Sequence, residues 1–221
     1  MNRKIRIGGQ AVIEGVMMKS PNFVSIAVRR SGGELSVKTK RWISFAERFP
    51  VLKRPVLRGP VVLLESLISG MQALVFSANQ ALDDGKKEES SKPLGGWALG
   101  ASVATALIIA AGLFIALPHV ITGLMGISVE TTSFHIIDGI IKVLIFIGYI
   151  VTISVSRDIR RVFQYHGAEH KSINAYEAGL PLSPEAAMKF STLHPRCGTA
   201  FLLLVLVVSV FAVSYTHLTL P

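Results

Sequence analysis

The chain has 221 residues, half of them hydrophobic, and a mean hydropathy of +0.51. Only 17% of the residues are charged, against roughly 25% in soluble domains, which excludes a disordered chain and argues against an ordinary soluble enzyme. The net charge of +9 fits nucleic-acid binding or a membrane protein with basic cytoplasmic loops, so its distribution must decide. A single cysteine excludes an internal disulfide framework.

The N-terminal part, residues 1–58, is predicted to be rich in β-structure. Three segments alternate apolar and polar side chains, as half-buried strands do: 5–14, 23–30 and 34–40. Three glycines indicate tight turns or close approach of the backbone: Gly8, Gly9 and Gly15. Their spacing matches neither a phosphate loop nor a dinucleotide fingerprint, which argues against nucleotide binding.

A helix is predicted over 59–82, with Pro60 in its first turn. Its only charge is Glu65, which lies in a polar stripe beside an apolar one. This amphipathic pattern favours a helix on the cytoplasmic membrane surface, or packed in a helix bundle, over a helix that spans the membrane. The following residues, 83–96, are predicted to form a polar linker.

Two apolar stretches are long enough to cross a bilayer, which takes about 20 residues of helix. The first, 97–117, carries no charged residue and is followed by Pro118. The second, 136–155, contains Asp138 and Lys142, four residues apart, which allows an ion pair on one helix face. Ionisable residues inside a membrane span are functional candidates by default, so both are candidate site residues.

A third apolar run, 199–213, has only 15 residues, and we interpret it as a truncated membrane span. The last residues, 214–221, change composition abruptly and are interpreted as a non-native tail, with a genuine periplasmic stub as the alternative. The predicted fold class is an α-helical integral membrane protein with a small N-terminal β-containing cytoplasmic part.

The distribution of Lys and Arg predicts the topology. Residues 1–96 hold 16 of the 23, the loop 118–135 holds none, and the loop 156–198 holds six. Because cytoplasmic loops carry the positive excess, a multi-pass protein of the cytoplasmic (inner) membrane with a cytoplasmic N-terminus is expected. This distribution accounts for the charge without nucleic acid. The expected partners are the lipid bilayer with its anionic headgroups, and a membrane-protein partner or a second copy of the chain.

The second span is expected to continue into the cytoplasm as one helix, to about residue 178. His166 and His170 are four residues apart, so both imidazoles lie on one helix face. Together with Glu169 they form an HxxEH pattern, in which two histidines bind zinc and the carboxylate acts as general base. The same face continues with Asn174 and Glu177. A solvated polar helix face is the alternative interpretation.

The segment 183–198 contains two further candidate ligands. Ser183-Pro184 indicates a helix start, and His194 and Cys197 follow that helix just before the third apolar run. The topology puts them on the same side of the membrane as the HxxEH histidines. Four such ligands make a closed structural zinc site, and three plus water make a catalytic one. The alternatives are a small buried cysteine and a turn histidine. His119 and His135, beside the outer loop, are interpreted as interfacial residues.

Three separated motifs resemble the YqhQ-like family of bacterial membrane proteins of unknown function, which are often labelled predicted metal-dependent enzymes. The motifs are Gly-Gly-Gln-Ala-Val-Ile-Glu-Gly-Val-Met-Met at 8–18, Tyr-His-Gly-Ala-Glu-His-Lys at 165–171 and His-Pro-Arg-Cys-Gly-Thr at 194–199. The resemblance covers residues 1–213. It implies an uncharacterised membrane protein, and relatives are expected to continue with further membrane and cytoplasmic sequence.

Three functions remain in competition. The first is a metal-dependent hydrolase that uses a divalent transition metal such as zinc to cleave a peptide or lipid-linked bond, with Glu169 as general base. The second is a non-enzymatic membrane scaffold or assembly factor with a structural His/Cys cluster. The third is a transporter, which Asp138 and Lys142 favour but which the absence of a visible broken-helix repeat in the sequence disfavours.

Overall fold

The computed structural model describes the chain except for residues 1–4, 6, 83–95 and 220–221, and the chain divides into two compact units. The sheet unit combines Met1–Glu88 with Ser156–His194, and the helical unit combines Glu89–Val155 with Pro195–Pro221. Nearly all of the predicted polar linker lies outside the described residues.

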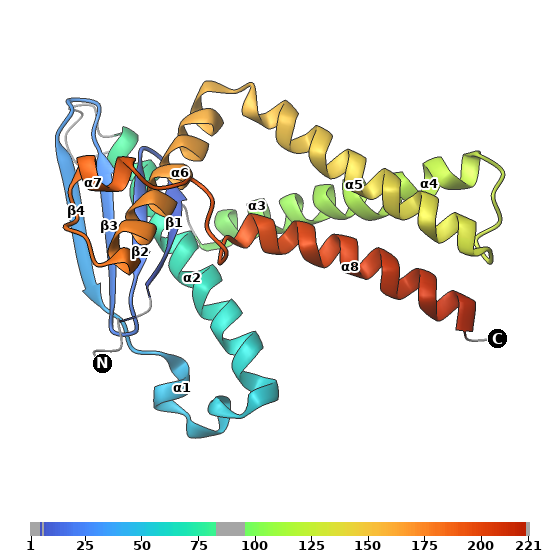
Figure 1. Ribbon diagram of the computed structural model, residues 1–221, viewed down its shortest axis with the longest axis horizontal. Coiled ribbons are helices and arrows are strands. Elements are labelled where there is room, and N and C mark those ends of the chain that lie inside the picture. The colour runs from blue at the N-terminus through green and yellow to red at the C-terminus, as the bar shows by residue number, and fades with distance from the viewer. Residues whose placement is uncertain (1–4, 6, 83–95, 220–221) are drawn as a thin grey trace. The chain divides into compact units, whose positions relative to one another are not determined.

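Four antiparallel strands, neighbouring one another in chain order, form the sheet that was predicted for the N-terminal part (Figure 1). They are β1 (Gly8–Val12), β2 (Gly15–Lys19), β3 (Phe23–Arg29) and β4 (Leu35–Arg41). The sequence did not identify β2. Met17 faces the buried core, and Val16 and Met18 line a pocket on the opposite face, so both faces of this strand are apolar. Such a strand lacks the alternation by which strands are recognised.

One face of the sheet packs against α2 (Pro55–Leu82). The core between them contains the following buried side chains: Val12, Met17, Val24, Ile26, Val28 and Ala73. Trp42 and Phe76 cover its edge. Burying each of the larger aliphatic side chains contributes about 1.5–3 kcal/mol, so this small core holds α2 on the sheet. The short helix α1 (Phe45–Arg48) and the 3₁₀ turn η1 (Pro50–Lys53) join β4 to α2.

The polar stripe of α2 faces the sheet, and its apolar stripe faces outward. Glu65, Ser69 and Ser77 are buried. The exposed residues include Gln72 and Asn79 of the predicted polar stripe, and also the large apolar ones: Val56, Leu57, Val62, Leu63, Leu64, Leu67, Ile68 and Leu74. The predicted amphipathic pattern is therefore present, but its apolar side has no partner among the described residues. By length and composition, Pro55–Ala81 is also apolar enough to cross a membrane.

The opposite face of the sheet is covered by α6 (Arg157–Ala178) and α7 (Pro184–Met188), which pack on each other while α6 contacts β1 and β2. Gly179 ends α6 in the left-handed conformation with φ of 77°, which glycine adopts without strain. Ser183 caps α7, as predicted, because its hydroxyl accepts a hydrogen bond from the backbone N–H of Ala186 at 3.3 Å. The sheet is thus the middle layer of the unit.

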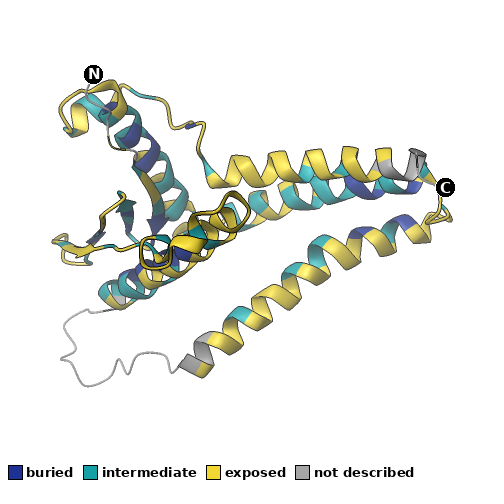
Figure 2. Ribbon diagram, turned by 90° about the horizontal axis from the view of Figure 1, so that it is seen from below, coloured by how far each residue is buried: buried dark blue, intermediate teal, exposed yellow. Residues whose placement is uncertain are grey.

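The helical unit contains α3 (Gly96–Ala111), the π-helical turn η2 (Gly112–Ala116), α4 (Leu117–Leu124), α5 (Thr132–Ser154) and α8 (Gly198–Thr219). Gly100–Leu124 and Thr132–Ser154 are long and apolar enough to cross a membrane, and the apolar part of α8, Gly198–Val213, is shorter. Figure 2 shows most of these helices as exposed. The described part of the chain is therefore mostly helical, and within it three helices, α2 included, could span a membrane by length and composition.

Several helix ends differ from the sequence predictions. α2 begins at Pro55, so Pro60 lies inside the helix and not in its first turn, and α5 begins at Thr132. The first apolar helix was expected to end before Pro118, but it continues to Leu124. The π-helical turn η2 directly precedes Pro118 and shifts the backbone hydrogen bonds by one residue, which accommodates the proline that lacks an N–H. The one long helix expected from 136 to 178 is divided, because Ser156 has an extended backbone (ψ 132°) and begins α6 as its N-cap residue.

Candidate metal centre

Three imidazoles meet in the sheet unit. The ring centroids of His166 and His170 are 4.3 Å apart, as expected for residues four positions apart on α6. The His194 ring, which comes from the segment after α7, lies with its centroid 5.7 Å from that of His170. His170 and His194 are buried, and His166 is half-buried. The structure therefore brings the rings of three of the four predicted metal ligands close together within one unit, with His194 Nε2 lying near Glu177.

The hydrogen bond of His170 determines its tautomer. Its Nδ1 lies 2.6 Å from the backbone carbonyl oxygen of Thr192. Because a carbonyl can only accept, Nδ1 carries the proton and donates it, and in the neutral ring Nε2 presents a lone pair. Metal-binding histidines commonly donate their second ring N–H to a backbone carbonyl or a carboxylate. The orientation of His170 thus fits that of a metal ligand.

Glu169 is a buried carboxylate with 4% of its surface exposed. Its Oε2 lies 3.3 Å from His166 Nδ1, but no donor among the described residues forms a hydrogen bond with that oxygen. A buried charged oxygen without a hydrogen bond is costly, and such atoms are rare in folded proteins. An incompletely bonded carboxylate beside the His166 imidazole fits a site that a cation completes.

β1 makes room for this carboxylate at Gly9. A Cβ atom at that position would lie 2.7 Å from Glu169 Oε1 and 2.8 Å from Met18 Sδ, closer than such contacts occur. The close backbone approach predicted for Gly9 is therefore confirmed, and the same holds for Gly15, where a Cβ would lie 2.1 Å from the Ala27 carbonyl oxygen. The sequence did not indicate that Gly9 faces the HxxEH helix.

Asn174 and Glu177, the predicted continuation of the histidine face, contact the segment that carries His194. Asn174 Nδ2 donates to the carbonyl oxygens of Ser191 and Leu193, at 3.1 and 3.2 Å. Glu177 Oε2 lies 3.5 Å from His194 Nε2. The absence of a side chain at Gly167 also helps, because a Cβ there would be 3.2 Å from Thr192 Cγ2. These residues position the segment rather than forming a separate site.

Cys197, the fourth predicted ligand, belongs to the helical unit, where its Sγ lies 2.9 Å from Thr199 Oγ1. It follows His194 by three residues, and a fully extended chain of that length spans at most about 11 Å. The covalent chain therefore keeps Cys197 near His194. Its role as a metal ligand stays a prediction.

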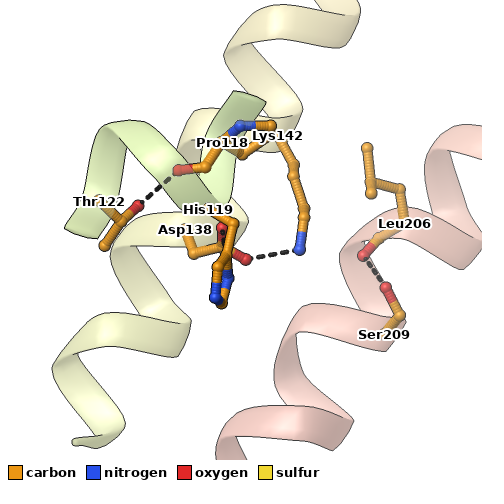
Figure 3. Close-up of polar contacts among 7 residues, drawn as sticks. All are labelled: Pro118, His119, Thr122, Asp138, Lys142, Leu206 and Ser209. Carbon is orange, nitrogen blue, oxygen red and sulfur yellow. Dashed lines mark hydrogen bonds and ion pairs between the residues drawn. The ribbon is translucent and has the colours of Figure 1, made fainter. Parts of the chain in front are cut away.

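Asp138 and Lys142 belong to a second polar cluster, which lies in the helical unit (Figure 3). They pair through Asp138 Oδ2 and Lys142 Nζ, which confirms the ion pair that their spacing allowed. The ring of His119 on α4 approaches from the other side, with Nδ1 4.0 Å from Asp138 Oδ1. His119 and His135 both lie on helices, because the loop between α4 and α5 is shorter than predicted.

Sequence reasoning missed an ion pair beside the histidines. Arg161 on α6 forms a two-pronged pair with Glu14, and the hydroxyl of Tyr165 donates to the same carboxylate at 3.3 Å. Glu14 has φ of 52°, so it occupies the left-handed region in the β1–β2 turn. The hydrogen bond from Arg161 is the largest cause that holds the pKa of Glu14 below 4.5. The sequence signal for this turn was the adjacent pair Glu14 and Gly15 in the first motif.

The comparisons with known proteins identify the family of the chain. The chain matches a family described as a protein of unknown function (DUF1385) over residues 54–220. It is 34% identical over 216 residues to the uncharacterized protein YqhQ of Bacillus subtilis (strain 168), an alignment that covers 92% of this chain and 67% of that relative. No solved structure matches the chain. The predicted resemblance to YqhQ-like proteins is therefore confirmed, and the chain belongs to the DUF1385 family.

Proposed function

We propose that the protein is a membrane-bound, metal-dependent hydrolase, with His166, His170 and either His194 or Cys197 as ligands. The observation that carries the proposal is the buried Glu169 Oε2, which has no hydrogen bond from any described residue and lies 3.3 Å from an imidazole nitrogen. The tautomer of His170 supports it, because Nε2 is left to bind a metal.

A divalent transition metal such as zinc, when bound, supplies the Lewis acidity that makes hydrolysis possible at neutral pH. The chain supplies the other requirements. The Thr192 carbonyl orients His170. Glu169 lies next to His166 and also lines a pocket, and its carboxylate acts as the general base that removes a proton from the attacking water.

The proposed location is the cytoplasmic face of the inner membrane. α2 turns a continuous apolar surface outward, and the helical unit holds two further helices that are long and apolar enough to span. The excess of Lys and Arg in residues 1–96 and 156–198 puts both parts of the sheet unit on the cytoplasmic side, next to anionic headgroups.

A non-enzymatic scaffold with a structural His/Cys cluster is the second candidate, and one observation favours it. His170, Lys171 and Asn174 all donate hydrogen bonds to backbone carbonyls between Met188 and Leu193. Four such bonds from three residues of one helix fix the path of that segment, which is what a structural cluster does. A bound metal would then complete the fold and take no part in a reaction.

Elemental analysis of the detergent-purified chain tests the site. About one transition-metal ion per chain is expected, lost in His166→Ala/His170→Ala and retained in the matched double variant His119→Ala/His135→Ala. Equal metal contents in the two variants, or no metal in the parent chain, would refute the proposal.

Glu169→Gln separates the two candidates. A hydrolase is expected to keep its metal and its thermal unfolding midpoint in this variant, while hydrolysis of a panel of ester and peptide substrates falls by about 100-fold or more. A structural cluster predicts no hydrolysis by the parent chain, together with loss of folding when the metal is removed by a chelator.

A further inference from the structure

An apolar pocket opens beside Glu169 within the sheet unit. It has a volume of about 550 Å³ and lies between α6, α7 and the sheet face opposite α2. Its apolar walls are formed mainly by the following side chains: Ile7, Val16, Met18, Leu182, Ala187 and Met188. The volume falls within the roughly 300–1,000 Å³ typical of small-molecule sites.

The polar side chains of the lining are mostly engaged with the protein itself. Ser172 Oγ donates to the Ala168 carbonyl at 2.9 Å, Ser183 Oγ caps α7, and the Tyr165 hydroxyl donates to Glu14. A peptide or a sugar would bury its own amides or hydroxyls here with few hydrogen-bond partners, which costs free energy for each group. A hydrocarbon chain carries no such groups, so it suits the pocket better.

One cationic group lines the same pocket. Lys171 is half-buried, and its Nζ donates one hydrogen bond to the Met188 carbonyl at 3.2 Å, which holds the ammonium beside α7. An ammonium has three donors, so this one can also bind an anionic oxygen. The other charged side chain of the lining, Glu169, is almost fully buried, so Lys171 is the more accessible charge. An apolar cavity with an accessible ammonium is complementary to a molecule that has a hydrocarbon chain and an anionic headgroup held at that ammonium.

We propose that this pocket binds one acyl chain of an anionic glycerophospholipid, with the headgroup at Lys171. The same chain holds helices that are long and apolar enough to cross a membrane, so such lipids surround the protein wherever those helices insert. The lipid is also the proposed substrate, with its ester bond in the pocket that Glu169 lines. This assignment of the substrate rests on the proposed hydrolase function. Binding itself does not require the metal.

Photo-crosslinking of the full chain in lipid nanodiscs tests the proposal. A phosphatidylglycerol probe with a diazirine near the end of one acyl chain is irradiated, and the adducts are mapped by mass spectrometry. Adducts are expected on α6 and α7 as well as on the apolar helices. Ala168→Phe puts a phenyl ring into the pocket and is expected to reduce the α6 and α7 adducts about tenfold.

The matched control is Ala178→Phe, the same substitution at an exposed alanine at the end of α6, outside the pocket, which leaves the adducts unchanged. Ala187→Phe fills the pocket from α7 and replaces Ala168→Phe if that variant fails to fold. Lys171→Gln is expected to lower labelling by phosphatidylglycerol several-fold, because one charge-assisted hydrogen bond to the headgroup is lost. Labelling by phosphatidylcholine is expected to stay unchanged.

Adducts confined to the apolar helices, or equal losses in Ala168→Phe and Ala178→Phe, would overturn the proposal. So would displacement of the probe by an apolar peptide at a lower concentration than by phosphatidylglycerol. His166→Ala/His170→Ala is expected to keep full labelling. Failure of the metal site therefore leaves the labelling intact, whereas failure of the lipid site leaves the metal content intact.

Discussion

Two carboxylates are buried on opposite faces of the same sheet, and each has 4% of its surface exposed. Glu65 on α2 accepts hydrogen bonds at one oxygen from the Ser44 hydroxyl, at 2.8 Å, and from the Phe45 backbone N–H. Glu169 on α6 has an oxygen without any hydrogen bond from the described residues, 3.3 Å from the His166 imidazole. Equal burial therefore accompanies very different bonding.

The difference separates a structural carboxylate from a candidate functional one. Glu65 fixes the turn that leads from β4 into α1, because its carboxylate satisfies groups at the N-terminus of that short helix. Glu169 Oε2 accepts no such hydrogen bond from the described residues, and burying a carboxylate oxygen in this way costs free energy unless a cation completes its bonding. Burial alone would have assigned both residues the same role.

The largest expected effect comes from making the same change at both sites. Glu65→Leu removes the acceptor for Ser44 and Phe45 and is expected to lower the free energy of unfolding by about 2–4 kcal/mol. Glu169→Leu in metal-free protein is expected to be neutral or stabilising, because a buried charge without a hydrogen bond is replaced by an apolar side chain. Denaturant unfolding in detergent measures both, and losses of equal size would contradict the comparison.

A smaller effect is expected from the backbone facing Glu169. Gly9→Ala pushes against the Glu169 carboxylate and the Met18 sulfur, which are flexible side-chain ends, so a cost of about 1 kcal/mol in the free energy of unfolding is expected, with the metal retained as in Glu169→Gln. Gly8→Ala is the matched control, since nothing lies within 4 Å of a Cβ there. Unfolding curves and metal titrations check the pair; a larger loss in Gly8→Ala would refute the role given to Gly9.

The smallest effect concerns the exposed pair beside the site. The pKa of Glu14 is lowered by Arg161, so the pair adds stability above the ordinary glutamate pKa of 4.5, and this contribution is lost as pH falls through the lower folded-state value. In Glu14→Gln, the free energy of unfolding is therefore expected to fall less steeply between about pH 5 and pH 3 than in the parent chain. Unfolding midpoints across that range measure it, and parallel curves for the two proteins would argue against the pair.

The sequence predicted the features that depend on local periodicity. The hairpin around Gly33, the i, i+4 pairs on α5 and α6 and the Ser183 cap all follow from spacings of a few residues. The family could also be recognised from the sequence, because each of the three motifs is a short continuous stretch of residues.

The features that were missed depend on contacts between distant residues. Glu169 contacts Gly9, although most of the chain separates the two residues in sequence. A periodic pattern of residues cannot predict such a contact. β2 lacked alternation because helices cover both faces of the sheet. The division at Ser156 was missed because a single extended residue can end a helix without proline or glycine.

The sheet unit is assembled from two stretches of chain, Met1–Glu88 and Ser156–His194, with the α3–α5 segment between them. A ribosome that adds roughly 5–20 residues per second needs on the order of 5–20 s to pass from Glu88 to His194. During that interval α2 can already cover its face of the sheet, while the face with Gly9 has no helix to meet. The order of synthesis therefore makes the histidine site the last part of the unit to form, after two apolar segments have left the ribosome.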